Sequence, residues 1–128
     1  MKALKIALLS AALILPAAVL AHGDKTGPNG GVVEDVGKYH VELLMKAGEL
    51  RVYVAGAGGA KVDTKGAEAS ATVLAGRERL TLKLAPAGGN ALAAAGKFDP
   101  RAGAKVVLSL AMPGQPVVSG RFGIPAKN

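Results

Sequence analysis

The chain has 128 residues, of which 50% are hydrophobic and 3% aromatic, and it contains no cysteine and no tryptophan. Without cysteine, neither a disulfide framework nor a thiolate metal site is possible. The formal net charge is +7, but Lys and Arg alternate with carboxylates and never form a run of three. Because nucleic-acid binding favours a concentrated basic face with stacking aromatics, this composition argues against it.

Residues 1–21 have the features of a cleavable secretory signal peptide. Lysines near the start precede an apolar run from Ile6 to Leu20, and the small residue Ala21 ends the segment. This order is typical of export signals, and the run is too short and too interrupted by proline for a membrane span. We therefore expect a mature chain that begins at His22 and is released into the periplasm without a membrane span.

Removing 21 of the 128 residues leaves 107, which is the size of a single domain. Two lysines leave with the signal, so the net charge of the mature chain is about +5, a mildly basic surface. We expect an N-terminal segment over residues 22–30, a β-sandwich domain over 31–122 and a C-terminal tail over 123–128.

Apolar residues of the domain recur with a period of two, and clusters of Gly, Pro, Asn and Asp interrupt them at short intervals. This pattern predicts antiparallel strands and almost no helix. In chain order, the predicted strands cover residues 32–36, 38–46, 50–54, 68–75, 79–84, 91–98, 106–110 and 118–122. Seven to eight such strands predict an all-β fold, a single immunoglobulin-like antiparallel β-sandwich.

One predicted strand has an alternative. The stretch Ala91–Ala95 favours a helical turn on propensity alone, because alanine is the best helix former. Its length argues against a helix, since so short a helix gains little without tertiary packing. The longest irregular segment runs from Gly56 to Gly66 and carries no recognisable chemical motif.

No enzyme signature is present in the sequence. Gly-x-Ser-x-Gly, the phosphate-cradling Gly-Lys-Ser/Thr and His-Glu-x-x-His are all missing, as is a catalytic cysteine. The Gly-rich segments have the composition of turns. We therefore expect a protein that binds without catalysis.

The two histidines are the residues most suited to chemistry. Cleavage after Ala21 would place an α-amine and an imidazole on His22, and such a residue can chelate a divalent metal. Cu(II) favours tetragonal nitrogen and oxygen sites of this kind, so copper is preferred to Zn(II). The third mature residue is Asp24 and not a histidine, so a further ligand has to come from elsewhere in the chain.

His40 is the expected second donor. Tyr39, Val41 and Leu43 alternate toward the core, so His40 and Glu42 should project together from the other face of the strand. The predicted metal site therefore consists of His22, His40 and Glu42. The plainer alternative is that His40 is a solvated strand residue and His22 an accident of cleavage.

Other residues are weaker candidates for metal ligands. Asp24, Glu34 and Asp35 can supply oxygen, but Glu34 and Asp35 suit the outer face and turn of the first strand. Met45 is in register with core residues of its strand, and Met112, in a loop, is the better soft-ligand candidate. None of these residues is included in the predicted site.

Two short motifs carry a resemblance to a known family. Gly27-Pro28-Asn29-Gly30-Gly31, followed by Tyr39-His40-Val41-Glu42-Leu43, resembles the small N-terminal domain of periplasmic adaptor subunits of heavy-metal efflux (RND) pumps and its stand-alone exported relatives. The similarity continues to the last strands and covers most of the mature chain, while the parts that bridge an adaptor to its channel are missing. It implies a β-sandwich and an association with heavy-metal resistance.

A vaguer likeness supports copper. CopC-type periplasmic copper carriers resemble this chain in being small cysteine-free β-sandwiches whose mature chain begins with a His ligand, although their later Asp-x-His pair is missing here. The sequence thus predicts a periplasmic heavy-metal binding or delivery protein, with a metal ion and an efflux component as partners. The alternative is a non-catalytic, metal-free interaction module that docks on an envelope or efflux assembly through a sheet edge or loop.

Overall fold

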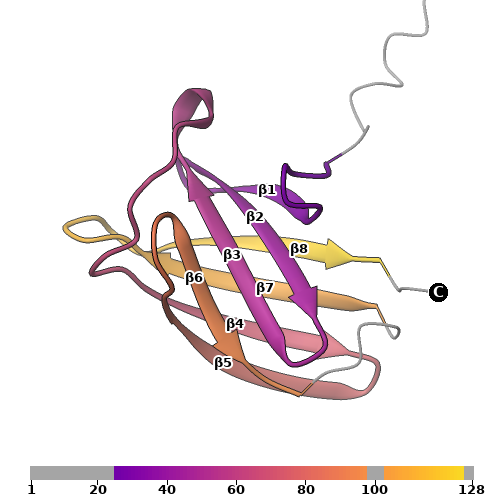
Figure 1. Cartoon of the computed structure of the whole chain (residues 1–128). Coiled ribbons are helices and arrows are strands. Elements are labelled where there is room, and N and C mark those ends of the chain that lie inside the picture. Colours follow the sequence, from indigo (N-terminus) through magenta and orange to yellow (C-terminus); the bar gives the residue numbers. More distant parts are fainter. Residues whose placement is uncertain (1–24, 98–102, 126–128) are drawn as a thin grey trace, which may run out of the picture.

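The structure, a computed structural model, describes residues 25–97 and 103–125 (Figure 1). The predicted signal peptide, His22, Asp24 and Phe98 lie outside these ranges. The described chain forms eight strands and one 3-10 turn, η2 (Ala57–Gly59). The strands are β1 (Val32–Val36), β2 (Tyr39–Lys46), β3 (Glu49–Ala55), β4 (Glu68–Ala75), β5 (Glu78–Pro86), β6 (Ala91–Ala95), β7 (Ala104–Ala111) and β8 (Val118–Ile124). The all-β sandwich expected from the sequence is confirmed.

The strands pair in the order β1-β2-β3-β6-β5-β4-β7-β8, and every pairing is antiparallel. Figure 1 shows two layers that cross each other, with β1, β2, β3 and β6 in one and β4, β5, β7 and β8 in the other. β5 joins the layers, because Ala85 and Pro86 pair with β6 while its earlier residues pair with β4. β6 lies beside β3 and β7 beside β4, which gives the Greek-key connections common in sandwiches.

The period-two pattern of the sequence places the core between the layers. In β2, Tyr39, Val41, Leu43 and Met45 are buried, as their alternation predicts. Burial of each such aliphatic side chain contributes about 1.5–3 kcal/mol. The largest buried side chains from both layers are Val36, Val41, Leu43, Leu50, Val52, Val54, Val73, Leu84, Leu92, Leu108, Leu110 and Phe122.

β8 packs closely against β1 where the two ends of the strand order meet. A Cβ atom at Gly120 would lie 2.5 Å from Cγ2 of Val36, and one at Gly37 would lie 2.6 Å from Cγ1 of Val118. No side chain fits at these distances, so the two glycines allow the close approach of the strands. Thr26 forms an antiparallel bridge to Val32 along the edge of β1 that faces away from β2.

Two details of the fold bear on the sequence-based predictions, namely the conformation of Ala91–Ala95 and the end of the last strand. Ala91–Ala95 is strand β6, because pairing with β3 places Leu92 opposite Val52 in the core and overrides the helix propensity of alanine. β8 continues to Ile124, so the last strand extends into the segment predicted as a tail. Within the described ranges, no helix has the length and apolar character needed to cross a membrane.

Candidate metal site around His40

β2 carries both described residues of the predicted site. His40 and Glu42 project from its outer face, as the alternation with core residues predicts. The His40 side chain is 49% exposed, whereas Glu42 is only 4% exposed. Both line a single pocket of about 290 Å³. His22, the third predicted ligand, lies outside the described residues.

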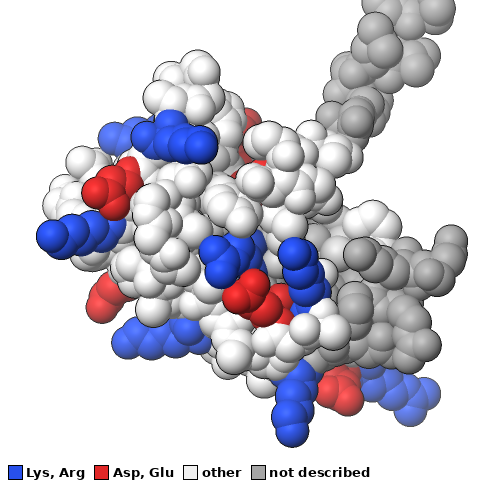
Figure 2. Space-filling view, in the orientation of Figure 1, with Lys and Arg blue, Asp and Glu red and all other residues white. Residues whose placement is uncertain are grey.

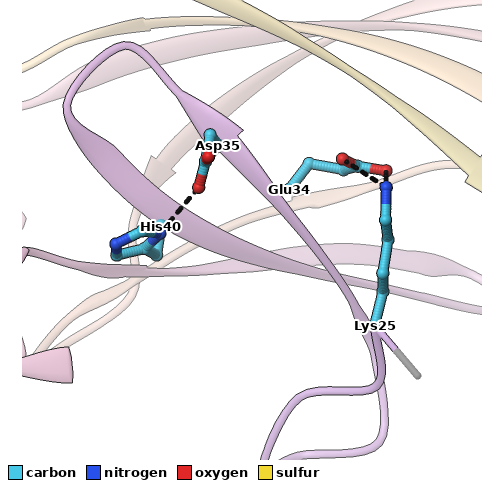
Figure 3. Close-up of polar contacts among 4 residues, drawn as sticks. All are labelled: Lys25, Glu34, Asp35 and His40. Carbon is cyan, nitrogen blue, oxygen red and sulfur yellow. Dashed lines mark hydrogen bonds and ion pairs between the residues drawn. The ribbon is translucent and has the colours of Figure 1, made fainter. Parts of the chain in front are cut away.

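Asp35 holds the imidazole ring of His40. The two residues are directly opposite each other in the β1–β2 ladder, and Nδ1 of His40 lies 2.7 Å from Oδ1 of Asp35 (Figure 3). When Nδ1–H donates to this carboxylate, the lone pair on Nε2 is the one left for a metal. A histidine that binds a metal is commonly oriented by a carboxylate in this way.

Glu34 has a different role from its neighbour Asp35. It is opposite Val41 in the ladder, and its carboxylate forms an ion pair with Nζ of Lys25 at 3.1 Å (Figure 3). The N–H of Val33 also donates to the carbonyl oxygen of Lys25 at 2.7 Å. Glu34 therefore ties the segment before β1 to the sheet and does not belong to the His40 site.

The carboxylate of Glu42 holds the turn over residues 27–31. Its Oε2 accepts hydrogen bonds from the backbone N–H groups of Asn29 and Gly31, at 2.9 and 2.7 Å. Its Oε1 accepts from Nδ2 of Asn29 at 3.0 Å. Gly27 packs against the same carboxylate, where a Cβ atom would overlap it. These bonds explain how the carboxylate can be buried, and of its roughly four lone-pair sites about one remains, on Oε1.

The two motifs noted in the sequence are therefore one structural unit. The turn of Gly27–Gly31 folds over β2 and covers Glu42, whose donors come from 11 and 13 residues earlier in the chain. The hydrogen bonds of Glu42 mainly stabilise the turn over residues 27–31. Only one acceptor position is left for a metal, and the role of Glu42 as a metal ligand stays a prediction.

The rest of the pocket comes from segments to which the sequence assigned no chemistry. Ala55 is opposite His40 in the β2–β3 ladder, and Lys61 forms an isolated bridge with Ala55 on its other side. Tyr53, opposite Glu42, and Asn90 also line the pocket. Lys61 lies in the irregular segment after β3, so no periodic pattern in the sequence indicates its position near His40.

Charges of both signs are spread over the surface of the protein (Figure 2). Figure 2 shows Lys and Arg spread over the visible face with Asp and Glu among them, and no broad patch of one sign. The hydrogen bond from Arg51 to Glu49 raises the pKa of the Arg51 guanidinium above its ordinary value, so this residue stays charged.

The methionines weighed as soft ligands belong to the core. Met45 is 6% exposed, as its register predicts, and Met112 is 5% exposed although it follows the end of β7. Burial among aliphatic side chains gives Met112 a packing role in the core, and neither methionine lines the pocket beside His40.

Across residues 25–97 and 103–125, no group of three or more His, Cys, Asp or Glu side chains is placed to hold a metal ion. Comparison of the chain with family models, with curated proteins and with solved structures finds no match. The chemistry of the site is thus the basis for a functional proposal.

Replacing Asp35 tests whether it tunes His40. We expect Asp35→Asn to weaken copper binding by about 10-fold, because an amide orients the imidazole less well and lowers its basicity. Calorimetric titration with copper measures this loss, and the thermal midpoint should not change, since the Asp35 side chain is 76% exposed. Glu78→Gln, at an exposed carboxylate of β5 away from the pocket, is the control and should bind copper as the wild type does. Equal copper affinities for Asp35→Asn and wild type would contradict the assignment.

Proposed function

We propose that the chain is a periplasmic protein that binds or delivers copper, with His40 as one nitrogen ligand and the amine and ring of His22 as the others. The observation that carries the proposal is the exposure and hydrogen bonding of the His40 ring. It is half exposed, its Nδ1 is bonded to Asp35 at 2.7 Å, and its Nε2 is left for a metal. Neutral imidazole in this arrangement is a common copper and zinc ligand.

The chain is long enough for His22 to reach His40. The antiparallel bridge between Thr26 and Val32 directs the chain at Lys25 toward the end of β1 that carries Asp35. His40 lies two strands away from Lys25 across the sheet, which is about 10 Å, and two residues further along the strand direction, which is about 7 Å. Three extended residues span about 10 Å. The backbone and the two side chains together cover this separation.

Copper is the proposed metal because an amine and imidazoles without thiolate match the preferences of Cu(II), and Zn(II) is the alternative. Glu42 contributes negative charge in the same pocket and the remaining acceptor site of Oε1. The metal is cargo in this proposal, and the role is binding, not catalysis. The resemblance to heavy-metal efflux adaptors supports a place in metal resistance, with an efflux component as partner.

Calorimetry on the correctly processed protein tests the proposal. We expect the wild type to bind one equivalent of copper, and the double variant His22→Ala, His40→Ala to bind it at least about 100-fold more weakly, or about 2.7 kcal/mol. The double variant should keep its thermal midpoint, because His40 is half exposed and outside the core. If it binds copper as tightly as the wild type, the proposed site does not exist.

A further inference from the structure

The pocket beside His40 has a second charged side chain that the metal site does not use. Lys61 lies across the pocket from His40, and the cross-strand register places Ala55 between them. Alanine offers only a methyl group, so Ala55 leaves room in the pocket between the segments that carry His40 and Lys61. The pocket measures about 290 Å³, which is enough for a small organic molecule.

The backbone that carries Lys61 is held in place. The N–H of Gly56 donates to the carbonyl oxygen of Ala60 at 2.8 Å, and the N–H of Val62 donates to that of Val54 at 3.1 Å. Thr64, which is 1% exposed, donates through Oγ1 to the carbonyl oxygen of Ala91 at 2.8 Å. The segment is therefore fixed against β3 and β6, and the position of Lys61 is built into the fold.

The charge of Lys61 is available to a ligand. In the described part of the chain, no carboxylate forms an ion pair with it. Glu42 also lines the pocket, but it is 4% exposed and its oxygens accept from the backbone and side chain of the 27–31 turn. Among the lining side chains the exposed charge is thus the positive one of Lys61, whereas the negative charge of Glu42 is buried under the turn.

The remaining walls favour an organic ligand with one negative charge. Pro28, Val33 and Ala55 supply apolar surface, and Tyr53 and Asn90 supply neutral polar groups. Small-molecule sites commonly combine apolar walls with a few placed polar groups. One lysine pairs well with one carboxylate, whereas a doubly charged phosphate would leave a charge unpaired against apolar walls.

We propose that this pocket binds a small organic carboxylate, with its oxygens on Lys61 and its apolar part against Pro28 and Val33. The inference goes beyond the copper site, because the ligand binds to the metal-free protein. It also gives a reason for the pocket to lie beside His40, since a carboxylate held there is a ready oxygen ligand for a metal on that imidazole.

Titration of metal-free protein with butyrate tests the proposal, using butyramide as the uncharged ligand of the same shape. Butyrate should cause saturable shifts of the amide resonances of Ala55, Lys61 and Asn90, with a dissociation constant on the order of 1 mM. Butyramide, and phosphate or chloride at matched ionic strength, should bind at least about 10-fold more weakly. No saturable shift with butyrate, or binding of phosphate or butyramide that is equally tight, overturns the proposal.

Two lysine variants complete the test. Lys61→Gln should weaken butyrate binding by at least about 10-fold, while Lys65→Gln, at an exposed lysine of the same segment, should bind as the wild type does. Equal affinity of Lys61→Gln and wild type, with the thermal midpoint unchanged, overturns the assignment. Because no metal is present, this result is independent of the copper calorimetry, and either proposal can fail alone.

Discussion

Protein that retains a methionine ahead of His22 is expected to lose most of its copper affinity and to keep its metal-free thermal midpoint. The extra residue moves the terminal amine off His22 and turns its nitrogen into an amide, which is a poor ligand unless deprotonated. The described fold starts at Lys25 and its first strand at Val32, so the sandwich does not depend on the added residue.

The loss can be read from thermal unfolding with and without copper. At a copper concentration 100 times the wild-type dissociation constant, binding stabilises the native state by about 2.7 kcal/mol, and a 100-fold weaker site leaves about 0.4 kcal/mol. Removing the methionine with a peptidase is the control and should restore the stabilisation. If both forms are stabilised equally by copper, His22 is not an amino-terminal ligand.

Replacing Glu42 by alanine is expected to lower the free energy of unfolding by about 2–4 kcal/mol. The change removes a charged acceptor of three hydrogen bonds and leaves the buried N–H of Gly31 without its partner. It also removes the side chain on which the 27–31 turn rests. Urea unfolding measures the loss, and Glu68→Ala, at an exposed strand position, should change stability by less than about 0.5 kcal/mol.

Glu42→Gln separates the structural role of this residue from a role in copper binding. The amide keeps the shape and one acceptor oxygen, so we expect it to lose about half as much stability as alanine. Copper titration of the folded Gln variant then shows whether the carboxylate itself contributes to affinity. A Glu42→Ala protein as stable as the wild type would mean that the turn draws no stability from these contacts.

Strand positions and core faces could be predicted because a buried face leaves little freedom of register. A shift of one residue in β2 would move Tyr39, Val41 and Leu43 from the core to solvent, so the period-two pattern predicts both the strand and the outward direction of His40. The same pattern could also predict the pairing of His40 with Asp35, because only the Gly37-Lys38 turn separates their strands. Asp35 enters the sequence-based prediction only as a reserve ligand, and its contact with His40 is not predicted.

The burial of Glu42 and the position of Lys61 could not be predicted in the same way. Glu42 occupies an outward position in β2, and it is buried only because the 27–31 turn folds back over it. Lys61 reaches the pocket through a segment with no period, held by Thr64 and by a bridge to Ala55. Both depend on contacts between segments that are distant in the sequence, and a local sequence pattern does not predict such contacts.

The close approach of β8 to β1 also affects how the protein behaves at high concentration. The outermost strands of a sheet carry backbone groups that can pair with another chain, and such edges are a common origin of aggregation. Gly37 and Gly120 let β1 and β8 face each other across the gap between the layers, and Thr26 bridges to the remaining edge of β1. This arrangement leaves the strands that end the sheet order less room to pair with those of a second copy, so we expect these glycines to limit aggregation as well as to allow packing.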